Sequence, residues 1–322
     1  MLALIQYTLL FASVLLLVAL GGCVSEHSGV INLGLEGIMV IGALGGALVM
    51  RFLPYTGTIP SRFGMFFGVF AASIAFGVLY SSLLAVACIN LKADQTIVGT
   101  ALNMLGTAIA TVFVKSMNTK LSLADEAAKR DNSSKIEYIE AKKAFTSWIG
   151  SFELNWFMIV ALLMLVVIFI MLYKTKFGLR LRACGEHPQA AASVGINVFK
   201  MRWAGVLLSG MLGGLGGITY ITTGVSEWKF EEGVFGFGFL ALAVMIFGAW
   251  DPVKIGGAAI LFGFFRALGR VYNGIDFLKS LNIPPALYNM LPYIVCLIVL
   301  AFTSKNSKAP KAEGIPYDKG MR

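Results

Sequence analysis

The stretch CVSEHSGVINLGLEGIMVIGALGG, residues 23–46, places a glutamate, Glu36, inside a segment that otherwise has the composition of a membrane helix. An ionisable side chain inside a bilayer costs about 2.5–3.5 kcal/mol on insertion scales, so it faces a partner or a water-filled path. Glycines surround Glu36, and irregular backbone is tolerated at membrane depth only where it lines a cavity or is buried in protein. The stretch therefore predicts a broken membrane helix, with the break near Ser25–Ile31.

The rest of the chain has the composition of a polytopic membrane protein. Of its 322 residues, 57% are hydrophobic and 13% are charged, whereas a soluble domain carries about 25% charged residues. The mean hydropathy is +0.79. We expect an all-α fold of about nine transmembrane helices, eight to ten if the short or broken segments are counted differently, because each helix satisfies its own backbone hydrogen bonds. The apolar segments lie at about 4–22, 29–50, 64–90, 95–116, 151–173, 200–223, 235–250, 254–271 and 286–303.

Several classes of function are excluded by what the sequence lacks. The net charge of +9 fits the Lys and Arg that collect in cytoplasmic loops, so we expect no nucleic-acid partner. The four cysteines form no CxxC pair and the two histidines lie far apart, which argues against a metal site or a disulfide framework. No P-loop, G-x-S-x-G or HExxH motif is present, so we expect no enzyme, no catalytic residue and no cofactor bound by this chain.

The beginning of the chain allows two interpretations. LGGC at residues 20–23 resembles a lipoprotein cleavage site. However, the first 22 residues contain no Lys or Arg, and a signal peptide requires a positively charged beginning. We therefore expect an uncleaved first membrane helix.

Two polar stretches indicate the topology. Asn118–Trp148 contains six basic and five acidic residues, whereas Tyr173–Arg202 contains six basic residues and one acidic residue. The tail, residues 304–322, is also basic, which favours a cytoplasmic end. Four expected spans separate the tail from the second stretch, so loop 174–200 is expected to be cytoplasmic and loop 117–150 external. Residues 1–303 then form a single transmembrane domain.

Glycine patterns predict close helix packing and a second broken segment. Gly42 and Gly46, like Gly210 and Gly214 or Gly213 and Gly217, have the small-xxx-small spacing that lets helix backbones approach. The segment EGVFGFGFLALAVMIFGAW, residues 232–250, loosely echoes SGVINLGLEGIMVIGA. One short, glycine-interrupted segment in each half of a chain is typical of transporters with discontinuous helices and a binding site near the bilayer midplane.

Polar residues within apolar segments are the candidates for function. Asn32 and Glu36 lie four residues apart, so on a helix they would share one face. They form either a pair that lines or gates a path, or a pair that caps broken backbone. Asn103 is a similar case. Asp94 is expected to cap the helix that follows it, and a pair of arginines one helical turn apart, Arg266 and Arg270, is expected to extend to the membrane interface.

The loop Tyr173–Arg202 has the pattern of a docking element. Within GLRLRACGEHPQAAASVGI, the stretch HPQAAASVG predicts a short helix that begins near Pro188 and is closed by Gly195. A short helix across a cytoplasmic loop requires a soluble partner. Its contact face must be small, and this is what the three consecutive alanines provide: Ala190, Ala191 and Ala192.

Five motifs, in order along the chain, carry a family resemblance. They are SGVINLGLEGIMVIGA, ADQTIVGTALNML, GLRLRACGEHPQAAASVGI, SGMLGGLGG and LALAVMIFGAWDP. Together they resemble the permease subunits of bacterial ABC importers, in the branch of the ribose, galactose and branched-chain amino-acid permeases. Within that branch the chain is most similar to the nucleoside-type, or simple-sugar, permeases. The resemblance covers about residues 5–303.

The resemblance implies roles for particular residues. The substrate path would include residues of the first broken helix and one position on a later helix: Asn32, Gly34, Glu36, Gly37 and Asn103. Coupling to the ATPase would involve the patterned loop: Gly178, Arg180, Arg182, Gly185, Glu186, Pro188, Ala190, Ala191 and Gly195. His187 stands where such permeases usually carry Asn, which bears on the capping of the short helix.

Function and partners also follow from the resemblance. It implies an inner-membrane permease that imports nucleosides, with ribose- or galactose-type sugars as the alternative. A separate ATP-binding subunit would hold and hydrolyse ATP with magnesium. A second permease subunit, expected to be a paralogue, would complete the path. A lipoprotein of the basic membrane protein family would deliver the substrate, and membrane lipids would surround the helices.

Two other classes of protein compete with this interpretation. An ion-coupled secondary transporter would place more ionisable groups in the membrane and would leave the patterned loop unexplained. A membrane scaffold would have no use for polar residues in broken helices.

Overall fold

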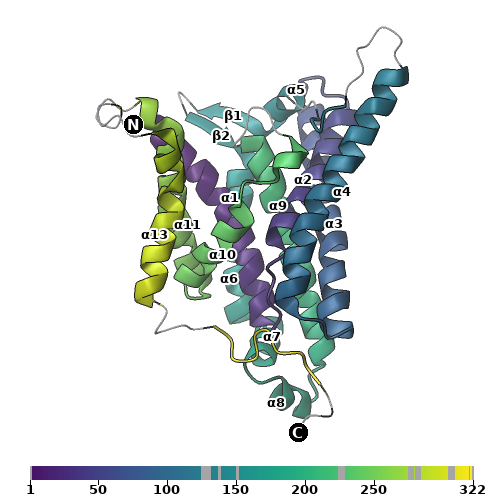
Figure 1. Cartoon of the computed structure of the whole chain (residues 1–322), viewed down its shortest axis with the longest axis vertical. Helices are drawn as coiled ribbons and strands as arrows, with labels where there is room; N and C mark the ends of the chain where they lie inside the picture. Colours follow the sequence, from purple (N-terminus) through teal and green to yellow (C-terminus); the bar gives the residue numbers. More distant parts are fainter. Residues whose placement is uncertain are drawn as a thin grey trace.

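A computed structural model describes residues 2–124, 132–136, 139–149, 152–223, 229–274, 279, 284–303, 309–318 and 320. These residues form an elongated bundle of helices that lie roughly along its long axis (Figure 1). Within this part of the chain, seven helices are long and apolar enough to cross a membrane: α1 (Leu2–His27), α2 (Leu35–Phe52), α3 (Ile59–Ala85, extended by a π-helical turn to Asn90), α4 (Gln95–Ala124), α6 (Trp156–Lys174), α9 (Val198–Thr223) and α11 (Pro252–Val271). The chain is a multi-pass membrane protein.

Two further apolar helices complete the bundle. The helix α10 (Phe237–Phe247) has only 11 residues, too few to span a bilayer, which requires about 20. The helix α13 (Pro285–Thr303) has 19 residues and contains Pro292. The shortness of α10 agrees with the discontinuous helix expected in this half of the chain.

The short elements gather at the two ends of the bundle (Figure 1). One end carries α5 (Ile139–Lys142) and the antiparallel pair β1 (Thr146–Ile149) and β2 (Phe152–Asn155); we call it the hairpin end. The opposite end carries α7 (Lys176–Glu186), α8 (Pro188–Ser193) and residues 309–318; we call it the α8 end.

The hairpin end differs from what the sequence predicts. The expected all-α fold contains this small two-stranded sheet. In addition, α4 runs to Ala124 rather than ending near residue 116. Charged residues from Lys115 onward end the apolar pattern, but a helix continues past a membrane boundary wherever its polar residues meet water or a partner. Here Lys115 pairs with Glu231, with 2.9 Å between Nζ and Oε2.

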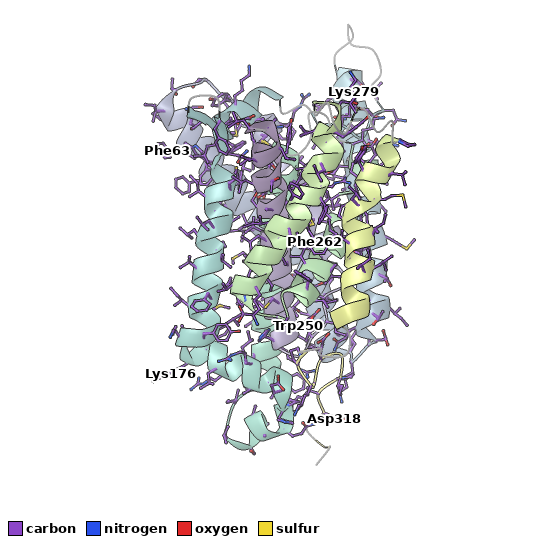
Figure 2. The ribbon with its side chains drawn as sticks, turned by 90° about the vertical axis from the view of Figure 1, so that its left-hand side faces the viewer. Phe63, Lys176, Trp250, Phe262, Lys279 and Asp318 are labelled. Carbon is purple, nitrogen blue, oxygen red and sulfur yellow. The ribbon has the colours of Figure 1, made fainter. Side chains whose placement is uncertain are left out.

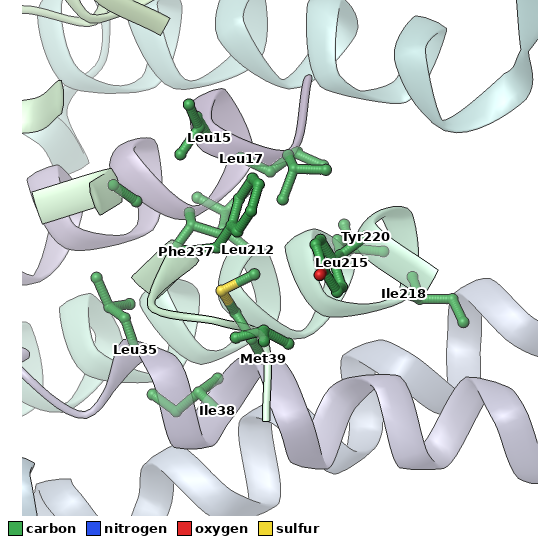
Figure 3. Close-up of a cluster of buried hydrophobic side chains, with 14 of the residues drawn as sticks. Leu15, Leu17, Leu35, Ile38, Met39, Leu212, Leu215, Ile218, Tyr220 and Phe237 are labelled. Atoms are coloured by element: carbon green, nitrogen blue, oxygen red, sulfur yellow. The ribbon is translucent and has the colours of Figure 1, made fainter. Parts of the chain in front are cut away.

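The centre of the bundle is built from α1, α2 and α9. The helix α1 packs against α9, α10 and α11, and α9 packs in turn against α2 and α3. Leu15, Leu17, Leu212 and Phe237 belong to this core, which brings the beginning of α10 against α1 and α9 (Figure 3).

Glycines bring α2, α3 and α9 into backbone contact, as their spacing predicts. A Cβ added to Gly42 would lie only 2.3 Å from the Cα atom of Gly214, and one added to Gly217 would collide with the carbonyl oxygen of Met39. Helices that touch at this distance have no room for side chains between them. The crossing therefore fixes the position of α2, whose first turn carries Glu36.

Candidate functional site

The first broken segment, Ser28–Gly34, separates α1 from α2. Because it lacks helical hydrogen bonds, its backbone must find other partners. The Ile31 N–H donates to Gln95 Oε1 at 2.7 Å and the Gly34 N–H donates to Asn32 Oδ1 at 3.1 Å. Asn32 also donates through Nδ2 to Ser209 Oγ of α9, at 2.8 Å. The segment is thus held to two neighbouring helices.

This geometry corrects the expected pairing of Asn32 with Glu36. A shared face requires both residues to be helical, but α2 begins at Leu35. Asn32 is fully buried and points to α9, whereas Glu36 points to the start of α10. Asn32 therefore supports the broken backbone.

Asn103 of α4 braces the same segment from the other side. Its Oδ1 accepts the Gly37 N–H at 2.9 Å, and its Nδ2 donates to the Leu33 carbonyl at 2.8 Å. A Cβ on Gly37 would lie 2.5 Å from the Leu102 carbonyl oxygen, so glycine is needed there for α2 and α4 to approach. Asp94 accepts the N–H groups of Thr96 and Ile97 at 2.9 Å and caps α4 as predicted.

The second broken segment, residues 233–236, leads into α10 and contains three residues with positive φ. Gly233, Phe235 and Gly236 have φ values of 60°, 52° and 77°. Such a backbone leaves N–H groups free, and Glu36 accepts two of them. Its Oε1 receives the Gly236 N–H at 2.8 Å and its Oε2 receives the Gly238 N–H at 2.7 Å.

Glu36 therefore joins the two broken helices at their N-terminal ends. It lies in the first turn of α2 and binds the first turn of α10, and both helix dipoles favour a negative charge at this point. Glu36 therefore caps backbone N–H groups, as one of the two alternatives proposed. These N–H groups belong to α10, in the other half of the chain, and not to the helix that carries Glu36. The residue is partly buried, and both carboxylate oxygens are engaged at the junction.

Three side chains surround the junction of Glu36 with α10. The Arg266 guanidinium lies 5.2 Å from the centre of the Phe237 ring, and the Tyr293 hydroxyl donates to the Phe235 carbonyl at 3.2 Å. Thr107 of α4 lies beside Gly233. Besides the expected extension to the membrane interface, which stays a prediction, Arg266 thus makes a cation–π contact with the first residue of α10.

Sequence reasoning missed several residues of this junction. Gln95 binds the first broken segment and lies in the motif ADQTIVG, next to Asp94. Its place beside a predicted helix cap could have marked it as a candidate. Ser209, Arg266 and Tyr293 come from distant helices, and nothing in their spacing indicates that they meet the broken segments.

The loop after α6 forms two short helices at the α8 end. The helix α7 is capped by Thr175, whose Oγ1 accepts the Gly178 N–H at 3.1 Å. Gly178 lies against the backbone of the last turn of α6, and Gly185 lies against the His27 carbonyl. The predicted short helix is present as α8, with Pro188 at its beginning and Gly195 beyond its end at a φ of 83°.

Ala191 does not lie on the exposed face where we expected it. Its side chain is buried and packs with Cys184 and Val198, while Ala190 is exposed. A six-residue helix must rest one face on the protein, and the spacing of three consecutive alanines does not indicate which one. The candidate docking face of α8 is therefore Gln189, Ala190, Ser193 and Val194, all exposed.

The remaining coupling candidates are spread over the surface of α7. Arg180, Glu186 and His187 are exposed. The Arg182 guanidinium lies 4.8 Å from the centre of the Tyr173 ring, which holds it against α6.

Within the described residues, no group of three or more His, Cys, Asp or Glu side chains could hold a metal ion.

The chain matches one protein family over nearly its whole length. The model of the family described as "Branched-chain amino acid transport system / permease component" matches residues 4–300. The chain belongs to this permease family. Its relatives are transport subunits, so this permease is a transport component and not an enzyme.

Three curated relatives of the permease are informative. It is 38% identical to the guanosine ABC transporter permease protein NupQ of Bacillus subtilis, covering 98% of this chain and 96% of the relative. It is 39% identical to the nucleoside ABC transporter permease protein NupC of Lactococcus lactis subsp. cremoris, covering 97% and 95%. It is also 26% identical to the permease protein NupB of the same organism, covering 94% and 80%.

Proposed function

We propose that this permease is one of two membrane subunits of an ATP-driven importer that carries nucleosides across the bacterial cytoplasmic membrane. The observation that carries the proposal is the identity of 38% and 39%, over nearly the whole chain, to two permeases named for guanosine and nucleosides. Sugars of the ribose or galactose type are the alternative substrate class.

The proposed topology has nine crossings. The seven long helices and α13 supply eight of them, and α10 together with the non-helical residues before it supplies the ninth. The α8 end would then face the cytoplasm with loop 174–200 and the basic tail, and the hairpin end would face outward with loop 117–150. This assignment agrees with the excess of basic over acidic residues in Tyr173–Arg202.

The proposed path runs beside the junction of the two broken helices. Glu36, Asn103 and Gly37 fix the position of α2 against α4 and α10. A single bundle provides one wall of such a path, and a second permease subunit would provide the other. Lactococcus lactis has two relatives of this chain, NupC and NupB, which supports a paralogue in that role.

Energy would come from a separate ATP-binding subunit that carries ATP and magnesium. The exposed face of α8 is the proposed docking surface. The helix α8 is short and projects beyond the bundle, and its exposed face carries small side chains (Figure 1). A lipoprotein of the basic membrane protein family would deliver the substrate at the hairpin end. Membrane lipids would cover the outer faces of α4 and α6, which carry exposed apolar side chains such as Met104 and Leu162.

Uptake of radiolabelled guanosine by cells that express the intact complex tests the substrate. We expect uptake that unlabelled nucleosides suppress and that ribose and galactose leave unchanged. Suppression by the sugars alone would favour the alternative substrate class. ATP-independent uptake that follows an ion gradient would instead indicate a secondary transporter.

Ala190→Glu tests the docking surface, with Lys200→Glu as a control at another exposed position of the same end. Ala190→Glu places a larger, charged side chain on the proposed contact face, so we expect normal membrane insertion but at least about tenfold weaker binding of the ATP-binding subunit, since overpacking costs about 1–3 kcal/mol. Normal binding by Ala190→Glu would exclude α8 as the coupling element.

A further inference from the structure

The end of the chain forms a strap across the α8 end of the permease. We define the C-terminal strap as residues 309–318, which lie against α7 and α8 (Figure 1, yellow). Its Ala312 N–H donates to the Gly185 carbonyl at the end of α7, at 2.8 Å. Arg202 of α9 donates through Nη1 to the Ile315 carbonyl at 2.9 Å. The strap is therefore attached through its backbone to two elements that flank α8.

A third attachment lies at the outer end of the strap. Asp318 pairs with Lys92, which stands in the turn before α4, with 3.0 Å between Oδ2 and Nζ. Asp318 and Lys176 are at the same end of the molecule as Trp250 (Figure 2). The strap thus bridges the turn before α4, the end of α7 and the beginning of α9.

The strap also completes the small core on which α8 rests. That core is separate from the main core and contains Cys184, Ala191, Val198 and Tyr317. The first three side chains are smaller than tyrosine, so Tyr317 is the one large ring among its buried members. Tyr317 is 7% exposed, and its ring centre lies 5.3 Å from that of Phe199.

The helix α8 depends on such support because of its length. It has six residues, whereas isolated helices shorter than about 12–15 residues are marginal in water. Its orientation is set by what its buried face touches. That face consists of Pro188 and Ala191, and Ala191 belongs to the small core together with Tyr317.

The same end of the permease has a hollow that is lined by both α8 and the strap. The hollow measures about 550 Å³ and is lined by Gln189, Ser193 and Asn197 from α8 and the turn after it, and by Tyr317 and Asp318 from the strap. A protein that binds the exposed face of α8 and enters this hollow therefore touches the strap as well.

We propose that the C-terminal strap positions the docking helix α8 for the ATP-binding subunit, with Tyr317 as the positioning residue. This inference rests on the proposed function of α8 as the docking surface. It makes the strap part of the coupling apparatus, since both α8 and the hollow beside it take their shape from Tyr317.

Tyr317→Ala tests the proposal and Tyr317→Phe is its matched control. Alanine removes the ring from the small core, whereas phenylalanine keeps it. Among the described residues the Tyr317 hydroxyl makes no hydrogen bond, and its loss changes only its electrostatic interaction with Arg202, so the effect should be smaller than that of removing the ring. A stop after Lys308 gives a second variant that removes the whole strap and leaves every described helix intact.

Cys184 provides a readout that does not involve the partner. It is fully buried in the small core, so a maleimide reaches it only when that core opens, and displacing the strap removes one side of the core. In a background where Cys23, Cys88 and Cys296 are replaced by alanine, we expect labelling of Cys184 to be at least about tenfold faster in Tyr317→Ala and in the truncated chain. Tyr317→Phe should label at the wild-type rate.

Binding of the purified ATP-binding subunit to the permease complex is the second readout. We expect Tyr317→Ala and the truncation to weaken binding about tenfold and to abolish substrate-stimulated ATP hydrolysis, and Tyr317→Phe to behave as the wild type. Fast labelling with normal binding would overturn the proposal, as would slow labelling in both variants.

Ala190→Glu separates this inference from the proposed function. If Ala190→Glu prevents binding while Tyr317→Ala and the truncated chain bind normally, α8 is the docking helix but the strap does not position it. If Ala190→Glu itself binds normally, the proposed docking surface is wrong, and the strap proposal is overturned with it.

Discussion

Glu36 connects two parts of the permease that are 200 and 202 residues apart in the sequence. A carboxylate has two oxygens, and here each accepts one N–H from the start of α10. No other side chain of similar length can do this, because an amide offers only one acceptor oxygen. The charge of Glu36 is thus explained by the geometry of the second broken helix.

Glu36→Gln should lower transport more than assembly. The glutamine NH2 group would face one of the two N–H donors, so one hydrogen bond of a kind that contributes about 1.5–3 kcal/mol is lost. We expect nucleoside uptake to fall severalfold while the complex elutes normally in size-exclusion chromatography. The exposed neighbour Glu232 provides the control, and Glu232→Gln should transport normally. Full uptake by Glu36→Gln would leave Glu36 with a structural role alone.

Asn103→Leu should act on stability instead. It leaves the Gly37 N–H and the Leu33 carbonyl without their side-chain partner, and an unsatisfied buried polar group costs about 1–3 kcal/mol. We expect the Tm of the detergent-solubilised permease to fall by several degrees. Thr100→Val, at an exposed position one turn away, should leave the Tm nearly unchanged. An unchanged Tm for Asn103→Leu would show that water replaces the lost amide.

At the scale of elements, the crossing of α2, α3 and α9 holds the junction in place. The crossing depends on glycines because backbone meets backbone. A helix that moved outward here would also move Glu36 away from α10, since Glu36 lies in α2. Packing at the crossing and geometry at the junction are therefore linked.

Gly42→Ala tests that crossing. Its new Cβ would lie 2.3 Å from the Cα atom of Gly214, so the helices must separate, at a cost of about 1–3 kcal/mol. Gly257 of α11 is a matched control because nothing lies within 4 Å of its added Cβ, and alanine there favours the helix by about 0.5–1 kcal/mol. Thermal unfolding followed by tryptophan fluorescence should show a lower Tm for Gly42→Ala only. Equal effects of the two substitutions would contradict backbone contact at the crossing.

Elements that follow from local chemistry were predictable from the sequence. The break before α2, the cap at Asp94 and the helix begun by Pro188 each follow from the residues at that place. The short hairpin Thr146–Asn155 was not predictable, because four-residue strands in a charged loop leave no clear alternation. The echo between the two broken segments predicted that both exist. It did not predict that Glu36 joins them, because contacts between distant segments depend on the packing of all the helices between them.

At the scale of the whole molecule, the end of α7, just before α8, is in direct contact with the end of α1, just before the first broken segment. Gly185, next to α8, packs on the carbonyl of His27, and the first broken segment begins at the next residue. Glu26 accepts the Trp250 Nε1–H at 2.5 Å and lies close to the carboxyl group of Glu313 in the strap. The sequence predicted a basic tail at this end but not its contacts, since these are made by backbone groups, one tyrosine and a pair of carboxyl groups.

Glu313 makes attachment of the strap depend on pH, because its carboxyl group is buried beside Glu26 while the strap is attached. Burial raises the pKa of Glu313 from its ordinary value of 4.5 to about 7. Between these two values the attached strap binds more protons than the released strap, so attachment weakens as the pH rises through this window and becomes constant above it.

We therefore expect the strap to be released more often at pH 8 than at pH 6, and Glu313→Gln to remove this dependence. Glutamine stays neutral throughout, so its strap should remain attached at both pH values. The measurement is the rate of Cys184 labelling in the wild type divided by the rate in Glu313→Gln, because the titration of the thiol itself cancels in this ratio. The ratio should rise from pH 6 to pH 8. If it stays constant, ionisation of Glu313 does not oppose attachment, and the strap is held by its other contacts: Tyr317, its backbone hydrogen bonds and the Asp318–Lys92 ion pair.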